Sequence, residues 1–66
     1  MQPIHPNIKV RLTGRFWNAF AILGAVSQAM RRAGCSKEQI SAFYTEATAG
    51  DYNALLATAM KYVDVR

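Results

Sequence analysis

Few residues in this 66-residue chain could act as a nucleophile, a base or a metal ligand. The only histidine, His5, lies in a proline-flanked lead-in, where nothing is expected to hold it beside a nucleophile. The only cysteine, Cys35, either approaches a helix N-terminus as a reactive thiol or fills a turn as a small apolar side chain. A histidine and a cysteine do not complete a usual zinc site, and Glu38 and Glu46 do not form a carboxylate pair. The sequence therefore predicts no catalysis, cofactor, metal or small-molecule substrate.

The size and charge of the chain narrow the classes of protein further. A chain this short buries only about 60% of the surface that its unfolded form exposes, so one small domain is expected. Eight Lys and Arg residues against four Asp and Glu residues give a net charge of +4, which is a mild attraction to polyanions. The longest apolar stretch, Ala19 to Val26, is far shorter than the roughly 20 residues of a membrane span. Residues 1–7 lack the pattern of a secretory signal, and a single cysteine cannot form the disulfides on which small secreted folds usually depend. A cytoplasmic protein without a membrane partner is expected.

The periodicity of apolar residues predicts an α+β fold. Residues 1–7 are interpreted as a flexible lead-in and residues 8–66 as a single small domain. Apolar and polar residues alternate over 8–13, which predicts a strand with one buried face. The end of the chain, 62–65, fits a helix or a strand. We favour a strand that pairs with the first, because β-branched Val63 and Val65 alternate with Asp64.

Three helices are predicted between these strands, near 18–33, 36–49 and 51–60, where apolar residues recur at spacings of three and four. Each has a recognisable start or end. The expected capping residues are Asn18, Gly34, Ser36 with Gln39, and Asp51. Gly24, in the interior of the first helix, suggests close packing against another element.

Four short motifs along the chain resemble those of a group of short uncharacterised bacterial and prophage proteins. The matching segments are NAFAILG at Asn18 to Gly24, the junction of Ala33, Gly34 and Ser36, the tripeptide from Gly50 to Tyr52, and the ending from Tyr62 to Val65. The resemblance extends from Ile8 to Val65. It implies the element order and an origin in a mobile element, but it implies no activity and no site residues. The sequence departs from the group at Phe16 and Trp17, where a short polar or glycine-containing loop is usual.

Those two aromatic residues and their neighbour Arg15 are the predicted contact surface for a protein partner. Adjacent aromatic residues in a loop cannot easily both point inward, and tryptophan is a frequent interface anchor. Alternatively, Trp17 folds over the end of a small core as a lid. Because two short strands leave open edges and a small core, the expected partner includes a second copy of the chain, as a homodimer. The main prediction is thus a small interaction or regulatory module.

Nucleic-acid binding is the alternative prediction. Two helices joined across residues 33–36 resemble a helix-turn-helix, whose second helix enters the major groove. Glu38 and Glu46 on that second helix argue against it, and an ordinary helical hairpin has the same spacing. The strand cations either bind nucleic acid weakly or keep the sheet face soluble. The residues of this alternative site are Lys9, Arg11, Arg31, Arg32 and Lys37.

Overall fold

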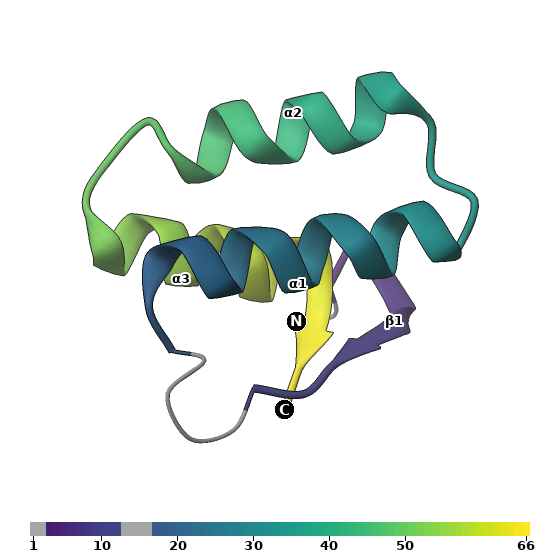
Figure 1. The fold of residues 1–66 in the computed structure, drawn as a ribbon, viewed down its shortest axis with the longest axis horizontal. Coiled ribbons are helices and arrows are strands. Elements are labelled where there is room, and N and C mark those ends of the chain that lie inside the picture. Colours follow the sequence, from purple (N-terminus) through teal and green to yellow (C-terminus); the bar gives the residue numbers. More distant parts are fainter. Residues whose placement is uncertain (1–2, 13–16) are drawn as a thin grey trace.

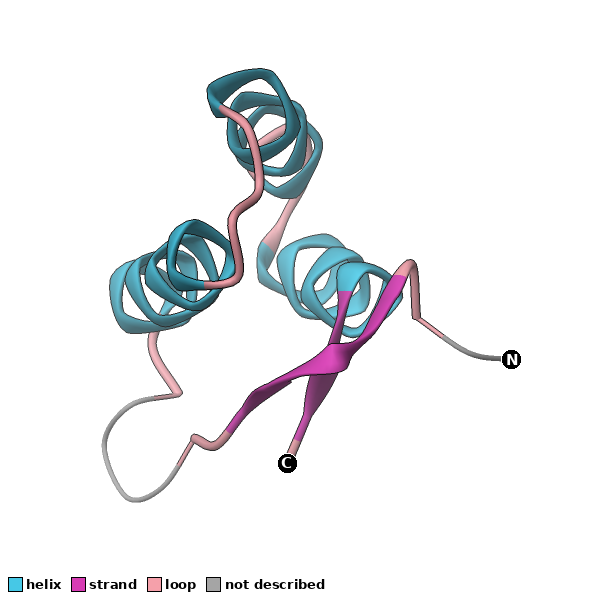
Figure 2. Ribbon diagram, turned by 90° about the vertical axis from the view of Figure 1, so that its right-hand side faces the viewer, coloured by secondary structure: helices cyan, strands magenta, loops and turns pink. Residues whose placement is uncertain are grey.

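The computed structural model describes residues 3–12 and 17–66 as a mixed α+β fold (Figures 1 and 2). The elements run in the order β1, α1, α2, α3, β2, which confirms the predicted class. Their bounds are β1 His5–Val10, α1 Ala19–Arg32, α2 Lys37–Ala47, α3 Tyr52–Tyr62 and β2 Val63–Val65.

The two strands pair in parallel, so the three helices form the crossover that such a pair requires. Val10 lies opposite Val65 in the register, and the Arg66 amide donates to the Val10 carbonyl oxygen at 2.7 Å. The register is irregular between His5 and Lys9, which is where Pro6 lacks a donor for the ladder.

The first strand begins earlier than predicted, at His5 rather than at Ile8. The two prolines predicted a loose lead-in over residues 1–7, but His5 pairs in parallel with Val63 of β2. The amide of Ile4, just before the strand, donates to the Lys61 carbonyl oxygen at 2.8 Å. At the other end the strand stops at Val10, although the Leu12 amide still donates to the Arg66 carbonyl oxygen at 3.0 Å.

The helices lie on one side of the sheet in two layers. Viewed from the side, all three are seen nearly end-on, and α2 lies farthest from the strands (Figure 2). Helix α1 packs on β1, α3 packs on β2, and α2 packs on α1 and α3. The core between these layers is formed by apolar residues that recur at the strand and helical periods, such as Ile8 and Val10 in β1 and Ile22, Val26 and Met30 in α1. Its fully buried larger side chains are Phe43, Ile22, Met30, Val26 and Val63.

All four predicted caps are present. The Asn18 and Asp51 side chains accept hydrogen bonds from the amides of Ala21 and Ala54, at 2.8 Å and 2.9 Å. Ser36 and Gln39 form the reciprocal capping box, with side-chain to amide distances of 3.2 Å and 2.8 Å. These local signals place the ends of the helices within a residue or two of the predicted positions.

Gly34 ends α1 with a positive φ of 91°, which makes it the left-handed residue of a Schellman motif. The Gly34 amide donates to the Arg31 carbonyl oxygen at 3.1 Å, and the Cys35 amide donates to the Met30 carbonyl oxygen at 3.0 Å. Gly24 is different. It is exposed, and a Cβ atom placed on it would meet nothing within 4 Å, so the predicted close packing at Gly24 is wrong.

Alanine substitutions at the two glycines should therefore change stability in opposite directions. Gly34→Ala should lower the free energy of unfolding by about 1–2 kcal/mol, because alanine is strained at positive φ. Gly24→Ala should raise it by about 0.5–1 kcal/mol, because it improves helix propensity without a clash. Urea unfolding measures the free energy of unfolding of both variants. A loss of stability in Gly24→Ala would show that another part of the folded chain packs against Gly24 after all.

Candidate functional site

Of the predicted contact residues, Arg15 and Phe16 lie outside the described residues, and Trp17 is described. Trp17 is 41% exposed, so the residue is not enclosed in the core. Its carbonyl oxygen accepts a hydrogen bond from the Tyr52 hydroxyl, and this bond joins the start of α1 to the start of α3. Tyr52 is itself 42% exposed. Two exposed aromatic side chains thus lie at the same end of the molecule.

Phe20 is the residue that the sequence interpretation missed. It lies in the first turn of α1 and is 85% exposed, more than any other large hydrophobic side chain in the described part of the chain. The helical period contained the signal, because Phe20 falls outside the buried stripe of Ile22, Leu23, Val26 and Met30. We call Trp17, Phe20 and Tyr52 the aromatic surface.

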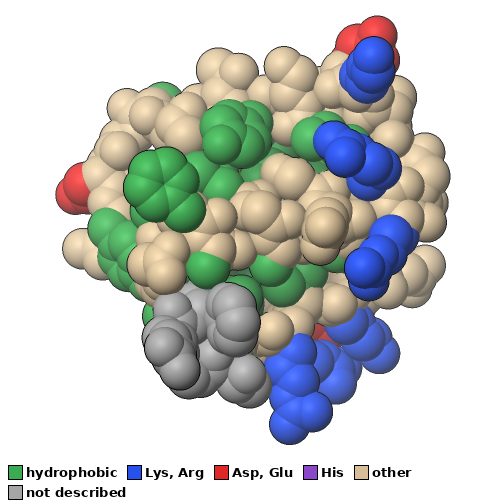
Figure 3. Space-filling model, in the orientation of Figure 1, with side chains coloured by type: hydrophobic (Ala, Val, Ile, Leu, Met, Phe, Trp, Pro, Cys, Tyr) green, Lys and Arg blue, Asp and Glu red, His purple; other side chains and the backbone are tan. Residues whose placement is uncertain are grey.

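A hollow of about 320 Å³ lies beside Phe20. It is bounded by the first turns of α1 and α3 and by the turn that connects α2 to α3. Leu23 and Leu55, which are almost buried, form its apolar floor, Ala47 lies beneath it, and Tyr52 lines it together with Phe20. An exposed aromatic ring and an apolar hollow are therefore neighbours on one surface. Figure 3 shows hydrophobic side chains gathered over this side of the molecule, toward the N-terminal end of α1.

Of the five cations of the alternative prediction, Lys9, Arg31, Arg32 and Lys37 lie toward the other end of α1, and Arg11 follows the end of β1. We call these five cations the basic edge. Arg31 and Lys37 line one groove, and Lys9 and Arg32 line a neighbouring hollow. Arg11 is two residues from Lys9 and is exposed like it. Figure 3 shows Lys and Arg side chains along this edge of the face. The structure thus brings together cations that are dispersed in the sequence.

These five side chains form no ion pair within the described ranges, 3–12 and 17–66. The two ion pairs there use other cations, Lys61 with Glu46 at 2.6 Å and Arg66 with Asp64 at 3.3 Å. The charges of the basic edge are therefore available to an anionic partner.

The arrangement of α1 and α2 differs from a helix-turn-helix. The two helices run antiparallel side by side in both views (Figures 1 and 2), whereas the helices of a helix-turn-helix cross at roughly 90–120°. The outer face of α2 also presents Glu38, Ser41 and Thr45 to solvent, with Lys37 as its only cation. This expectation is corrected to an antiparallel helical hairpin, the other interpretation of the same spacing.

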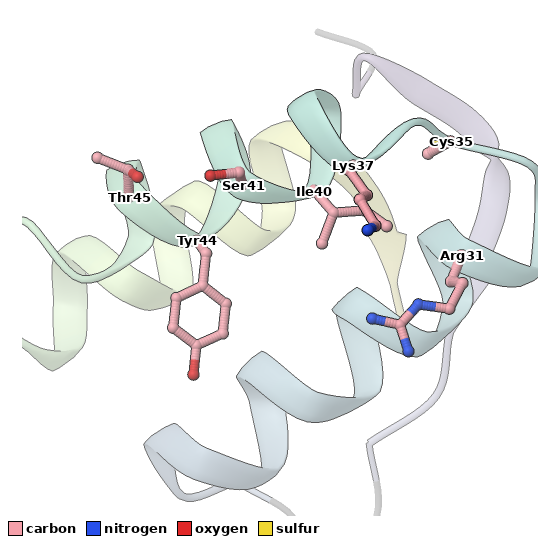
Figure 4. Close-up of a pocket in the computed structure, with 7 residues that line it drawn as sticks. All are labelled: Arg31, Cys35, Lys37, Ile40, Ser41, Tyr44 and Thr45. Carbon is pink, nitrogen blue, oxygen red and sulfur yellow. The ribbon is translucent and has the colours of Figure 1, made fainter.

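A groove of about 570 Å³ lies along this hairpin, lined mainly by α2 together with Arg31 of α1 and Cys35 of the turn (Figure 4). The Tyr44 ring, the Ile40 side chain and the Arg31 guanidinium all extend into the space between the two helices. Tyr44 is 46% exposed, so one side of its ring remains open to solvent. We call this the α1–α2 groove.

The two candidate nucleophile and base residues lie near each other but do not interact. His5 and Cys35 line the same hollow of about 240 Å³, and no hydrogen bond joins them. Within the part of the chain that the structure describes, no group of three or more His, Cys, Asp and Glu side chains could hold a metal ion. Nor does any described helix have the length and hydropathy to cross a membrane.

A cluster of Glu46, Lys61 and Tyr62 joins α2 to the end of α3, and the sequence did not predict it. Glu46 accepts hydrogen bonds from the Lys61 ammonium at 2.6 Å and from the Tyr62 hydroxyl at 3.0 Å. The Lys61 and Tyr62 hydrogen bonds hold the pKa of Glu46 below its ordinary value. The hydrogen bond to Glu46 raises the pKa of Lys61. The pKa of Tyr62 is also raised, mainly by burial and to a smaller extent by its hydrogen bond to Glu46. Tyr62 also packs edge-on against Phe43, with 5.4 Å between ring centroids.

These shifts predict a dependence of stability on pH. Because the pKa of Glu46 is lowered in the folded chain, its contribution is complete above the ordinary value of 4.5 and is lost as the pH falls through the lowered pKa. The contributions of Lys61 and Tyr62 are complete below their ordinary pKa values and are lost in alkali. The melting temperature of the wild type should therefore fall more steeply in acid than that of Glu46→Gln. Parallel acid profiles would show that the cluster adds nothing in solution.

No known protein family matches this sequence, and no curated protein or solved structure is significantly similar to it. The resemblance to short bacterial and prophage proteins therefore stays a prediction. The class that the fold defines is a small α+β domain with a two-stranded parallel sheet and three covering helices. Its candidate functional surfaces are the aromatic surface, the basic edge and the α1–α2 groove.

Proposed function

We propose that this chain is a small non-enzymatic interaction module that forms a homodimer through the aromatic surface. The observation that carries the proposal is the exposure of Phe20 beside an apolar hollow. Large aromatic side chains with apolar neighbours are typical anchors of protein interfaces, where they fill a pocket on the partner. Trp17, from the originally predicted set, lies in the same surface as Phe20 and Tyr52.

The geometry of Phe20 and the hollow favours a second copy as the partner. In a two-fold symmetric dimer the same patch faces itself, so a protruding residue of each copy meets a depression on the other. Phe20 stands on the rim of a hollow of about 320 Å³, which is large enough for an aromatic ring. One patch thus contains both halves of a self-complementary contact. Gly24, one helical turn after Phe20, is exposed and has no side chain to obstruct the approach of a second copy.

The distribution of charge is compatible with this dimer. The chain carries a net charge of +4, so a contact that joined two basic edges would be repulsive. Phe20 and Arg31 lie near opposite ends of α1, about 16 Å apart along the axis at the rise of an α-helix. A contact centred on Phe20 therefore keeps Arg31 and Arg32 of the two copies away from the centre of the interface.

The size of the domain gives a reason for self-association. A chain of this length buries a smaller fraction of its surface than larger domains do, so its core contributes little stability. Burying Trp17, Phe20 and Tyr52 against a second copy removes exposed aromatic surface from water, at roughly 25 cal/mol for each Å² of apolar area. The proposal places the module in the cytoplasm, where a protein with one cysteine stays reduced, and keeps its origin in a mobile element as a hypothesis from the resemblance.

Sedimentation equilibrium tests the proposal. The measurement covers protein concentrations from about 5 µM to about 500 µM, since dimerisation follows mass action. We expect the average mass to rise from that of one chain toward that of two and to stop there, because a two-fold contact is closed. A monomer at every concentration would contradict self-association, and masses that keep rising would contradict a closed two-fold contact.

A further inference from the structure

We propose that the α1–α2 groove and the basic edge together bind single-stranded nucleic acid, with phosphates on the cations and a base stacked on Tyr44. The proposal uses none of the residues of the aromatic surface, so it goes beyond dimerisation. Three observations support it. The cations of the basic edge form no ion pair among the described residues, an exposed aromatic ring lies in the groove, and Arg31 and Lys37 belong to both the basic edge and the groove.

The cations form a track of two neighbouring pairs rather than one isolated pair. Lys37 and Arg31 line the groove, Arg32 follows Arg31 in α1, and Lys9 shares a hollow with Arg32. None of them is neutralised by a carboxylate in the part of the chain that the structure describes. A track of this kind follows a chain of phosphates, because each phosphate neutralised releases condensed counterions.

The groove provides what a track of cations alone lacks, a surface that recognises a base. Tyr44 extends from α2 into the groove with its ring partly open to solvent, between the cations and the N-terminal half of α1 (Figure 4). Ile40, next to it, contributes apolar surface. Proteins that bind single strands combine a positive groove with aromatic side chains on which bases stack, and such stacking tolerates any sequence.

A duplex fits this surface less well than a single strand. The bases of a duplex are stacked on each other, so none is free to contact Tyr44. Readout of the major groove would require a helix with several polar and basic side chains on its exposed face, but α2 presents one cation, Lys37, next to the carboxylate of Glu38. The antiparallel hairpin also projects no separate recognition helix (Figure 2).

The test is fluorescence anisotropy of a labelled oligothymidylate of about 12 nucleotides, a length within the site sizes of single-strand binders. Contacts from Lys9, Arg11, Arg31, Arg32 and Lys37 give a salt slope of about −3.5 for a single strand, so affinity should fall roughly 100-fold between about 50 mM and about 200 mM salt. A duplex of the same length and an abasic strand of the same charge serve as comparison probes. Both should bind about tenfold more weakly than the oligothymidylate at the lower salt concentration.

Two variants separate charge from stacking. Arg31→Ala should reduce the salt slope by about 0.7, because one phosphate contact is lost. Tyr44→Ala should weaken binding about tenfold with little change in slope, and Tyr44→Phe, which keeps the ring, should restore it. Phe20→Ala should leave both the slope and the Tyr44 effect unchanged, so failure of the dimer is detected separately from failure of this site.

Three results would overturn the proposal. The first is no binding of the oligothymidylate at the lower salt concentration. The second is equal binding of single strand, duplex and abasic strand, with no effect of Tyr44→Ala, which would reduce the interaction to general charge attraction. The third is tighter binding of polyglutamate than of the oligothymidylate, which would assign the groove to an acidic protein partner instead.

Discussion

Replacing Phe20 with alanine should raise the dissociation constant of the dimer by two to three orders of magnitude while leaving the fold intact. A central aromatic anchor contributes about 2 kcal/mol or more, and a two-fold contact loses it twice, so the total is about 4 kcal/mol. The isolated chain loses little, because Phe20 is largely exposed before association. Sedimentation equilibrium measures the dissociation constant, and circular dichroism confirms that the helices remain.

Met60→Ala is the matched control for Phe20→Ala. Met60 is also a large exposed apolar side chain of a helix, at 58%, but it lies near the C-terminal end of α3. It should leave the dissociation constant unchanged. If Met60→Ala weakens the dimer and Phe20→Ala does not, the interface lies on the opposite part of the molecule, where Ile4 is also exposed.

Replacing Phe43 with alanine should lower the free energy of unfolding by about 3–5 kcal/mol. Phe43 is fully buried in α2 and packs edge-on against Tyr62, so its removal leaves a cavity where the two helical layers meet. A domain of this length has a total stability of only roughly 3–10 kcal/mol. The variant should therefore lose a large part of its stability and melt at a clearly lower temperature than the wild type, which thermal unfolding by circular dichroism measures.

Tyr44→Ala is the control for this core prediction, because Tyr44 is the next residue of the same helix and faces the groove rather than the core. It should change the free energy of unfolding far less than Phe43→Ala. Similar losses at Phe43 and Tyr44 would contradict the burial pattern of α2, since they would require both faces of the helix to be packed.

The fold could be predicted where the signals are local. The caps at Asn18, Ser36 and Asp51 depend on bonds within one helical turn, and all of them are present in the structure. The short C-terminal strand was also predicted, from two β-branched residues and the need for a partner strand. Its parallel direction was not predicted, and this direction is why β1 begins at His5. Strand pairing across the whole chain has no local signature.

The candidate site was predicted only in part, for the same reason. The aromatic residues next to the first helix were predicted to form a contact surface, and Trp17 lies near the candidate surface at the start of α1. Phe20 was not predicted, because the helical period identifies the residues that a helix buries and does not rank the exposed ones. The hollow beside Phe20 is formed by residues from three parts of the chain, such as Leu23, Ala47 and Leu55. The basic edge was predicted as a set of residues, but its continuity depends on how β1 packs beside the end of α1.

The most direct test of the proposed dimer is an isotope-filtered nuclear Overhauser measurement on a mixture of labelled and unlabelled protein. This experiment detects contacts between copies and suppresses those within one copy. Packing of Phe20 into the hollow predicts intermolecular signals between its ring protons and the methyl groups of Leu23 and Leu55, which form the floor of the hollow. Intermolecular signals confined to Ile4 and Met60, in a sample whose mass is that of a dimer, would contradict the aromatic surface as the interface.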